Sequence, residues 1–160
     1  MLARAFHSDG HDVVVLSRRP HIRPWRVIEW DGAMLGDWQR EIDGADVIVN
    51  LAGRSVNCRY NAANRQEILQ SRVESTRVIG EAIARARRPP PTWLQASTAT
   101  IYAHRYDAGN DEWSGALGGS ESNAPSSWRF SIEVARAWER AFDDAATTAT
   151  RTVVMVVIAQ

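Results

Sequence analysis

The chain has 160 residues, a length that suits one domain with a sizeable core, and its 19 basic and 19 acidic residues leave no formal net charge. Without a global basic field, we expect no nucleic-acid partner and no binding to an anionic membrane surface. All 19 basic residues are arginines, so any mechanism that needs a lysine is excluded. Cys58 is the only cysteine, which excludes an internal disulfide and a cysteine cluster for a metal ion.

No stretch of the sequence approaches the roughly 20 apolar residues of a membrane span. The first residues, Met1 to His7, lack the apolar core of a signal peptide. We therefore expect a cytoplasmic protein with no membrane partner.

The start of the chain predicts a helix end followed by a strand. Met1 to Ser8 resembles the end of a helix, Asp9-Gly10-His11 is a turn, and Asp12 to Arg18 is an apolar strand. A doubly wound sheet normally begins with a strand, a glycine-rich turn and a helix. The sequence thus predicts a fold that lacks this first strand and turn. The strands on either side of the gap must then either close up on each other or leave backbone groups unpaired.

The run from Asp46 to Gly53 predicts the strand around which the chain is organised. It is apolar on both faces, as in a parallel strand that helices cover on both sides. The other expected strands are Trp25–Trp30, Pro91–Tyr102 and Arg151–Ala159, and the other expected helices are Asp37–Asp43, Gln66–Ala86 and one capped by Ser126 or Ser127. This alternation predicts an α/β fold with a doubly wound parallel sheet, and a site at the carboxyl ends of its strands.

Two apolar stripes are predicted to face the core, together with Trp38. Within Gln66–Ala86 the stripe is Leu69, Val73, Thr76, Gly80 and Ile83, and in the last helix it is Ile132, Ala135, Trp138, Phe142 and Ala145. Gly80 on the inner face suggests close packing against a sheet or a partner helix. Asp107 to Ser127 is rich in glycine and serine and predicts a mobile loop over the site.

Arg18 and Arg19 follow the first predicted strand. At this place an NAD-binding fold commonly has an acidic residue for the ribose, and an NADP-binding fold has an arginine for the 2′-phosphate. Two interpretations stay open: Arg18 binds a phosphate, or the two arginines are a solvated strand end. If a cofactor is bound, Arg18 favours NADP(H) over NAD(H).

Several short motifs carry a resemblance to a known family. The run Ser97-Thr98-Ala99-Thr100-Ile101-Tyr102 resembles the Ser-Ser/Thr-Ala-x-Val/Ile-Tyr motif of extended short-chain dehydrogenases/reductases, which include NAD(P)-dependent sugar epimerases and dehydratases. Four more segments resemble its "epimerase family" branch: Val15–Pro20, Asn50–Gly53, Gln66–Thr76 and Ala137–Glu139. The resemblance runs from Met1 to about Val154, and the order of the motifs is what makes it specific.

The resemblance implies a Rossmann-type fold and a set of site residues. Asn50, Leu51, Ala52 and Gly53 would lie beside the cofactor, with Ser97 near them, and Thr98 would assist proton transfer. The implied cofactor is NADP or NAD, and the implied substrate is a small molecule such as a nucleotide sugar. A homodimer through the helix Gln66–Ala86, with Gly80 allowing close approach, is also suggested, with a monomer as the alternative.

The chain departs from this family at the catalytic pair of tyrosine and lysine. The segment Trp128 to Val134 matches the motif by its position, but Phe130 stands where the tyrosine is expected and Val134 where the lysine is expected. Neither can transfer a proton. The polar residues that remain near the predicted site are Thr98, Tyr102, His104, Tyr106, Asp111 and Glu112. Thr98 and His104 are the candidates for catalysis, although a loop histidine is more often simply solvated.

The sequence therefore predicts a partial NAD(P)-binding domain over residues 1–160, without the smaller substrate domain of extended members and without a metal site. Its function would be that of an NAD(P)-dependent epimerase/dehydratase-like protein, impaired as given. Two alternatives stay open: a non-catalytic module that senses a dinucleotide or acts as a scaffold, and an inactive gene fragment.

Overall fold

The computed structural model describes residues 1–105, 107, 109–111, 113 and 115–157. Its elements, in chain order, are α1 (Leu2–Ser8), β1 (Val14–Ser17), β2 (Arg26–Glu29), the 3-10 helix η1 (Asp37–Glu41), β3 (Val47–Asn50), α2 (Ala62–Arg85), β4 (Thr92–Thr98), the 3-10 helix η2 (Ala99–Ile101), α3 (Ser126–Asp143) and β5 (Arg151–Val157). Each predicted strand and helix is present, mostly with shifted ends, and the α/β class is confirmed.

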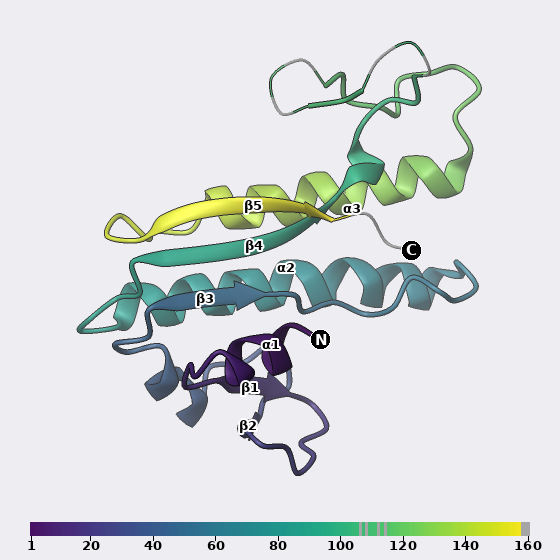
Figure 1. The fold of residues 1–160 in the computed structure, drawn as a ribbon. Helices are drawn as coiled ribbons and strands as arrows, with labels where there is room; N and C mark the ends of the chain where they lie inside the picture. The colour runs from purple at the N-terminus through teal and green to yellow at the C-terminus, as the bar shows by residue number, and fades with distance from the viewer. Residues whose placement is uncertain (106, 108, 112, 114, 158–160) are drawn as a thin grey trace.

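The five strands form two parallel sheets instead of one. β1 pairs with β2, and β3, β4 and β5 form a second sheet in that order. Figure 1 shows β1 and β2 below β3, with β4 and β5 above it. In the described part of the chain no hydrogen-bonded ladder joins β1 to β3. A doubly wound sheet has its first strand between the two strands that correspond to these. The two strands on either side of the predicted gap, β1 and β3, have therefore not closed up on each other.

This arrangement corrects the prediction for the strand within Asp46–Gly53. Its apolar pattern is that of an interior strand, but β3 lies at the edge of a three-stranded sheet. As a result Val47 keeps 48% of its surface exposed and Leu51 keeps 56%, whereas Asn50 is buried.

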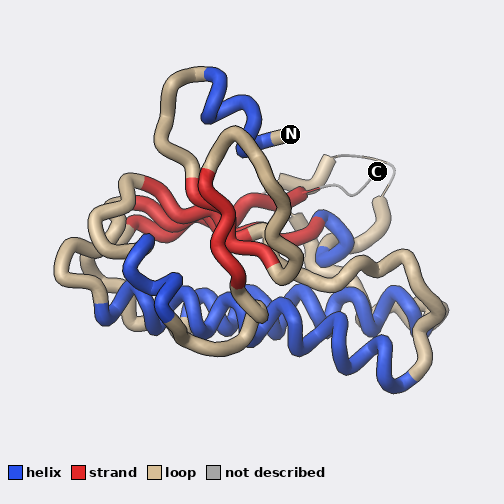
Figure 2. Tube along the Cα trace, turned by 90° about the horizontal axis from the view of Figure 1, so that it is seen from below, coloured by secondary structure: helices blue, strands red, loops and turns tan. Residues whose placement is uncertain are grey.

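Side chains connect the two sheets where hydrogen bonds do not. One core cluster lies between the strands, α2 and η1, and consists of Trp30, Trp38, Ile42, Val78, Ile79, Ala82, Ile83, Trp93 and Phe142. Leu16 and Ile28 of the first sheet and Ile48 of the second pack against it. Figure 2 shows the two long helices on one side of the strands and the short N-terminal helix on the other. The core thus lies on the α2 side, and Trp38 belongs to it as predicted.

The predicted stripes are confirmed in part. In α3, Ile132, Ala135, Trp138 and Phe142 are buried, whereas Ala145 follows the helix and is only partly buried. In α2 the buried side is broader than the stripe and includes Ile68, Ser75, Thr76, Val78, Ile79, Gly80, Ala82 and Ile83, while Leu69 and Val73 are half-buried. The stripe is too narrow because α2 packs against the core of the sheets and against α3.

Gly80 packs within the chain. A Cβ atom there would lie 2.8 Å from the Ala145 Cβ atom and 3.5 Å from the Trp93 ring. Packing against the sheet is confirmed, and this face of α2 is already covered within the chain. The homodimer through α2 stays a prediction.

The prediction of a side-chain cap at the start of α3 is wrong. Pro125 takes the N-cap position, and no side chain caps the helix, so the predicted caps Ser126 and Ser127 are instead the first helical residues. In the loop before it, Tyr102 forms an isolated antiparallel bridge with Leu117. Residues 108, 112 and 114 of this loop, and Tyr106 before it, lie outside the described residues.

The described residues contain neither a helix long and apolar enough for a bilayer nor a group of three or more histidine, cysteine or acidic residues that could hold a metal ion.

Candidate functional site

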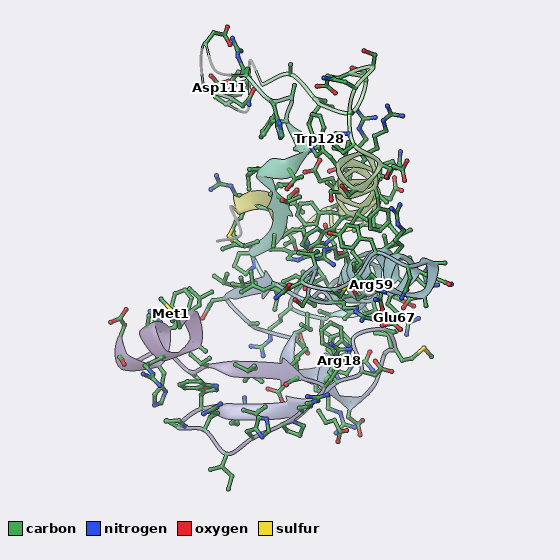
Figure 3. All side chains as sticks on the ribbon, turned by 90° about the vertical axis from the view of Figure 1, so that its right-hand side faces the viewer. Met1, Arg18, Arg59, Glu67, Asp111 and Trp128 are labelled. Carbon is green, nitrogen blue, oxygen red and sulfur yellow. The ribbon has the colours of Figure 1, made fainter. Side chains whose placement is uncertain are left out.

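The carboxyl ends of the strands bring most of the predicted site residues to one side of the molecule. Arg18 follows β1, Leu51 to Gly53 follow β3, and Thr98 ends β4. Figure 3 looks at the molecule from this side; Arg18 lies in the lower half of the view, below Glu67 and Arg59, and Asp111 lies at the opposite end. Arg18 is exposed, so its guanidinium is accessible to a ligand.

Asn50 holds the turn after β3 from inside the protein. The side chain is buried, and its Oδ1 accepts a hydrogen bond from the Ala52 N–H at 3.0 Å. Its Nδ2 donates to Gln95 Oε1 at 2.9 Å and lies 3.3 Å from Thr76 Oγ1. Any contact of Asn50 with a cofactor would therefore come from its main chain.

The same buried network reaches α3. Trp138 Nε1 donates to Thr76 Oγ1 at 3.0 Å, and Gln95 Nε2 donates to the Ala96 carbonyl at 3.1 Å. Buried polar groups are costly unless they are paired. Here the pairing links the strand end that precedes Leu51 to both long helices, which favours a single conformation of the turn.

Ser97 and Thr98 point to opposite faces of β4, as successive residues of a strand do. Ser97 is buried and its Oγ donates to Glu139 Oε1 of α3. Thr98 is half-buried, and its Oγ1 lies 2.9 Å from Thr100 Oγ1 and accepts from the Thr100 N–H. Of the two residues, only Thr98 therefore has a hydroxyl near the surface.

His104 lies beside a shallow open hollow of about 330 Å³, lined by Ala99, Tyr102, Ala103, His104, Arg105 and Asn110. Its imidazole stacks on the Trp128 ring with centroids 4.3 Å apart. Trp128 in turn donates from Nε1 to the Thr100 carbonyl at 3.1 Å. Arg105 on the hollow's rim pairs with Asp107, which raises the pKa of the guanidinium. The structure thus places His104 and Thr98 on one segment, but gives no direct contact between their side chains.

The positions of the family's tyrosine and lysine are occupied by core residues. Phe130 and Val134 are buried on α3 and pack with Ile68 of α2. The Phe130 ring meets the Tyr60 ring edge-on at 5.5 Å, and the Arg65 guanidinium lies 4.8 Å from its centroid. The prediction that neither residue transfers a proton is consistent with this apolar packing.

Sequence reasoning missed Gln95 and Arg72. Gln95 is a polar residue in the middle of an apolar strand, a signal that could have revealed a buried network. Arg72 lies among polar residues of α2 and has no distinct pattern in the sequence, although its guanidinium lies 5.1 Å from the Trp138 ring centroid.

Comparison with known proteins gives consistent results. Residues 1–152 match the model of a family described as "NAD dependent epimerase/dehydratase family". The chain is 35% identical over 114 residues to the epimerase family protein SDR39U1 of Bos taurus, covering 69% of this chain and 36% of that protein.

Solved structures show the same fold. The human epimerase family protein SDR39U1 (isoform 2), crystallised with NADPH, superimposes with a TM-score of 0.75 at 28% identity, over 97% of this chain and 48% of that one. A nucleoside-diphosphate sugar epimerase from Corynebacterium glutamicum gives a TM-score of 0.68 at 27% identity, over 97% of this chain and 30% of that one. These likenesses confirm the predicted Rossmann-type fold, and the chain spans less than half of each of these proteins.

Proposed function

The chain belongs to the NAD-dependent epimerase/dehydratase family, and on that premise we propose that it forms the nicotinamide-dinucleotide side of an epimerase- or dehydratase-like oxidoreductase or isomerase. The substrate would be a small molecule of the nucleotide-sugar class, because one similar structure is that of a nucleoside-diphosphate sugar epimerase. NADP(H) is favoured over NAD(H), since Arg18 is exposed at the end of β1 and the similar human structure contains NADPH.

The observation that carries the proposal is the held turn after β3. Asn50 fixes the Ala52 N–H, while Leu51 and Gly53 stay exposed on the side of the molecule where β1 ends in Arg18. These residues fit the ribose and phosphate groups of a dinucleotide. The described residues include no strand, glycine-rich turn and helix in succession that would hold its pyrophosphate.

When bound, a nicotinamide cofactor would supply hydride transfer. The chain's own residues would orient the substrate and move its proton. Thr98 would hydrogen-bond the reacting hydroxyl, and the imidazole of His104 would accept its proton.

A second candidate is a non-catalytic module that binds a dinucleotide without turning it over. The burial of Phe130 and Val134 at the positions of the acid/base pair favours it. The two candidates share the cofactor and differ in turnover.

Binding is tested by calorimetric titration of NADPH and NADH into residues 1–160 and into the same chain preceded by a strand and a Gly-x-Gly-x-x-Gly turn. We expect micromolar binding of NADPH only by the extended chain, because the turn and the helix N-terminus that follows it bind the pyrophosphate. An extended chain whose three turn glycines are replaced by valine is the matched control and should not bind. Micromolar binding by residues 1–160 alone would contradict the need for the turn, and no binding by any chain would contradict the proposed function.

Turnover is tested with the extended chain, NADP⁺ and a panel of nucleotide sugars. NADPH absorbance reports net oxidation, and chromatography of the sugar products reports epimerisation or dehydration, in which the cofactor is regenerated. We expect Thr98→Val and His104→Gln each to lower the rate by about 10² to 10⁴, the usual contribution of general acid–base catalysis. Tyr60→Phe and Tyr102→Phe are the controls and should change it far less. A thousandfold loss in either tyrosine variant, with the fold intact, would overturn the assignment, and absence of turnover with intact NADPH binding would favour the second candidate.

A further inference from the structure

The main chain of Arg54, just past the held turn, is fixed by α2. The Arg54 N–H donates to Ser71 Oγ at 2.9 Å, and its carbonyl accepts from Arg72 Nη1 at 3.1 Å. The Arg54 side chain forms an ion pair with Glu67. We call these three residues, Glu67, Ser71 and Arg72, the Arg54 anchor. Together they pair the main-chain N–H and carbonyl of Arg54 and the charge of its side chain.

Arg72 is the unusual member of the Arg54 anchor. Its guanidinium is half-buried, and burial lowers its pKa. Its contacts in the described part of the chain are the Arg54 and Ile68 carbonyls and the face of the Trp138 ring, and none of the described carboxylates forms an ion pair with it. A half-buried cation without a carboxylate loses part of its hydration, whereas an apolar side chain of similar length would pack on Trp138 without that cost. Stability alone therefore does not account for an arginine here.

Gly53 makes room for this guanidinium. A Cβ atom on Gly53 would lie 3.1 Å from Arg72 Cζ and 3.3 Å from its Nη1 atom, closer than most such contacts. The turn and the arginine are thus fitted to each other, and the fit depends on a residue without a side chain.

Trp138 connects the two ends of the turn. Its indole N–H holds Thr76, which lies in the network of Asn50 and so of the Ala52 N–H. The face of the same ring carries Arg72, which holds the Arg54 carbonyl. Both ends of the segment Leu51–Arg54 are therefore held through one side chain of α3, while Leu51 and Gly53 are exposed to solvent.

We propose that Arg72 is a positioning residue that fixes the main chain of Leu51–Arg54 in the conformation that receives the dinucleotide. The role of this segment in dinucleotide binding rests on the proposed function, whereas the fixing of its main chain by Arg72 does not. Loops held in their binding conformation bind more tightly because less ordering is needed on binding.

The first test compares Arg72→Met and Arg72→Lys in residues 1–160, with Arg77→Met, an exposed arginine on the same helix, as the matched control. We expect the Ala52 and Arg54 amides of Arg72→Met to exchange with solvent at least about tenfold faster, as local opening becomes easier. Its urea midpoint should stay unchanged or rise, because a buried charge is removed. The exchange rates of Arg72→Lys should lie between those of Arg72→Met and the parent chain. Lysine keeps a charged hydrogen-bond donor group but loses the planar stack on Trp138. Unchanged exchange at the two amides, or faster exchange shared equally with β4 and α2, would overturn the proposal.

The second test measures NADPH binding by the chain preceded by the strand and glycine-rich turn. Arg72→Met should raise the Kd by about tenfold and Arg77→Met should leave it unchanged, because only the former frees the turn. An equal Kd for the Arg72→Met and parent chains would overturn the positioning role. If the parent chain does not bind NADPH while its Ala52 and Arg54 amides remain protected by Arg72, the proposed function fails and the fixing of the turn stands.

Discussion

Arg18 is the residue on which we expect the choice between the two nicotinamide cofactors to depend. In the extended chain, Arg18→Ala should weaken NADPH binding by about 1 to 3 kcal/mol, since charge-assisted hydrogen bonds to a phosphate are lost. NADH binding should change little, because NADH lacks that phosphate. Calorimetric titration of both cofactors measures the difference.

The neighbouring Arg19 provides a matched control. It is also exposed, but its main chain forms two hydrogen bonds with Ser17 Oγ, each of 3.2 Å, and Arg19→Ala leaves these in place. We expect it to affect both cofactors slightly and equally. Equal losses for NADPH and NADH in Arg18→Ala would instead give Arg18 a structural role.

At the residue scale, the sequence indicates which residues gather at the site better than it indicates which way they point. Ser97 and Thr98 are both hydroxyl residues at a strand end, so alternation requires one of them to face the helices but does not say which. Asn50 was expected at the cofactor, and its side chain instead serves Ala52, Gln95 and Thr76. Two of these partners, Gln95 and Thr76, come from other segments, and no local pattern in the sequence encodes their approach.

At the element scale, α2 depends on close packing at one glycine. Gly80→Ala should lower the free energy of unfolding by about 1 to 2 kcal/mol, because the steric cost of overpacking exceeds the gain in helix propensity of at most about 1 kcal/mol. The added Cβ atom would meet the Ala145 Cβ atom at 2.8 Å. Urea denaturation followed by tryptophan fluorescence measures the loss.

The exposed Arg77 on the same helix serves as the control for this substitution. Arg77→Ala should stay within about 0.5 kcal/mol of the parent chain, as surface changes usually do. A Gly80→Ala chain more stable than its parent would show that Ala145 can move aside, and would remove the reason for a glycine at this position.

Element ends were harder to predict than element types. The helix expected from Gln66 begins at Ala62, because Asn61 caps it and its side chain accepts from the Asn64 N–H at 2.9 Å. Asn61 is a visible capping signal that the apolar stripe, which starts later, does not include. The strand expected over Asp12–Arg18 is only Val14–Ser17, since its sole partner in the described sheet is the four-residue β2.

At the scale of the whole molecule, the sequence predicts the gap in the sheet but not how the chain responds to it. The prediction of this gap rests on the order of the elements. Whether β1 and β3 would then pair depends on packing, and the cluster around Trp30 and Trp38 lies against strands of both sheets without bringing their edges together. Such a balance of burial against backbone pairing cannot be judged from local patterns.

The open edge of β3 has a consequence for mass action. An unpaired strand edge is a template for a strand from another molecule, and a second copy that paired there would occupy the place of the strand that precedes a glycine-rich turn. The apparent stability of residues 1–160 would then rise with their own concentration. The same chain preceded by a strand would cover this edge and should show no such dependence.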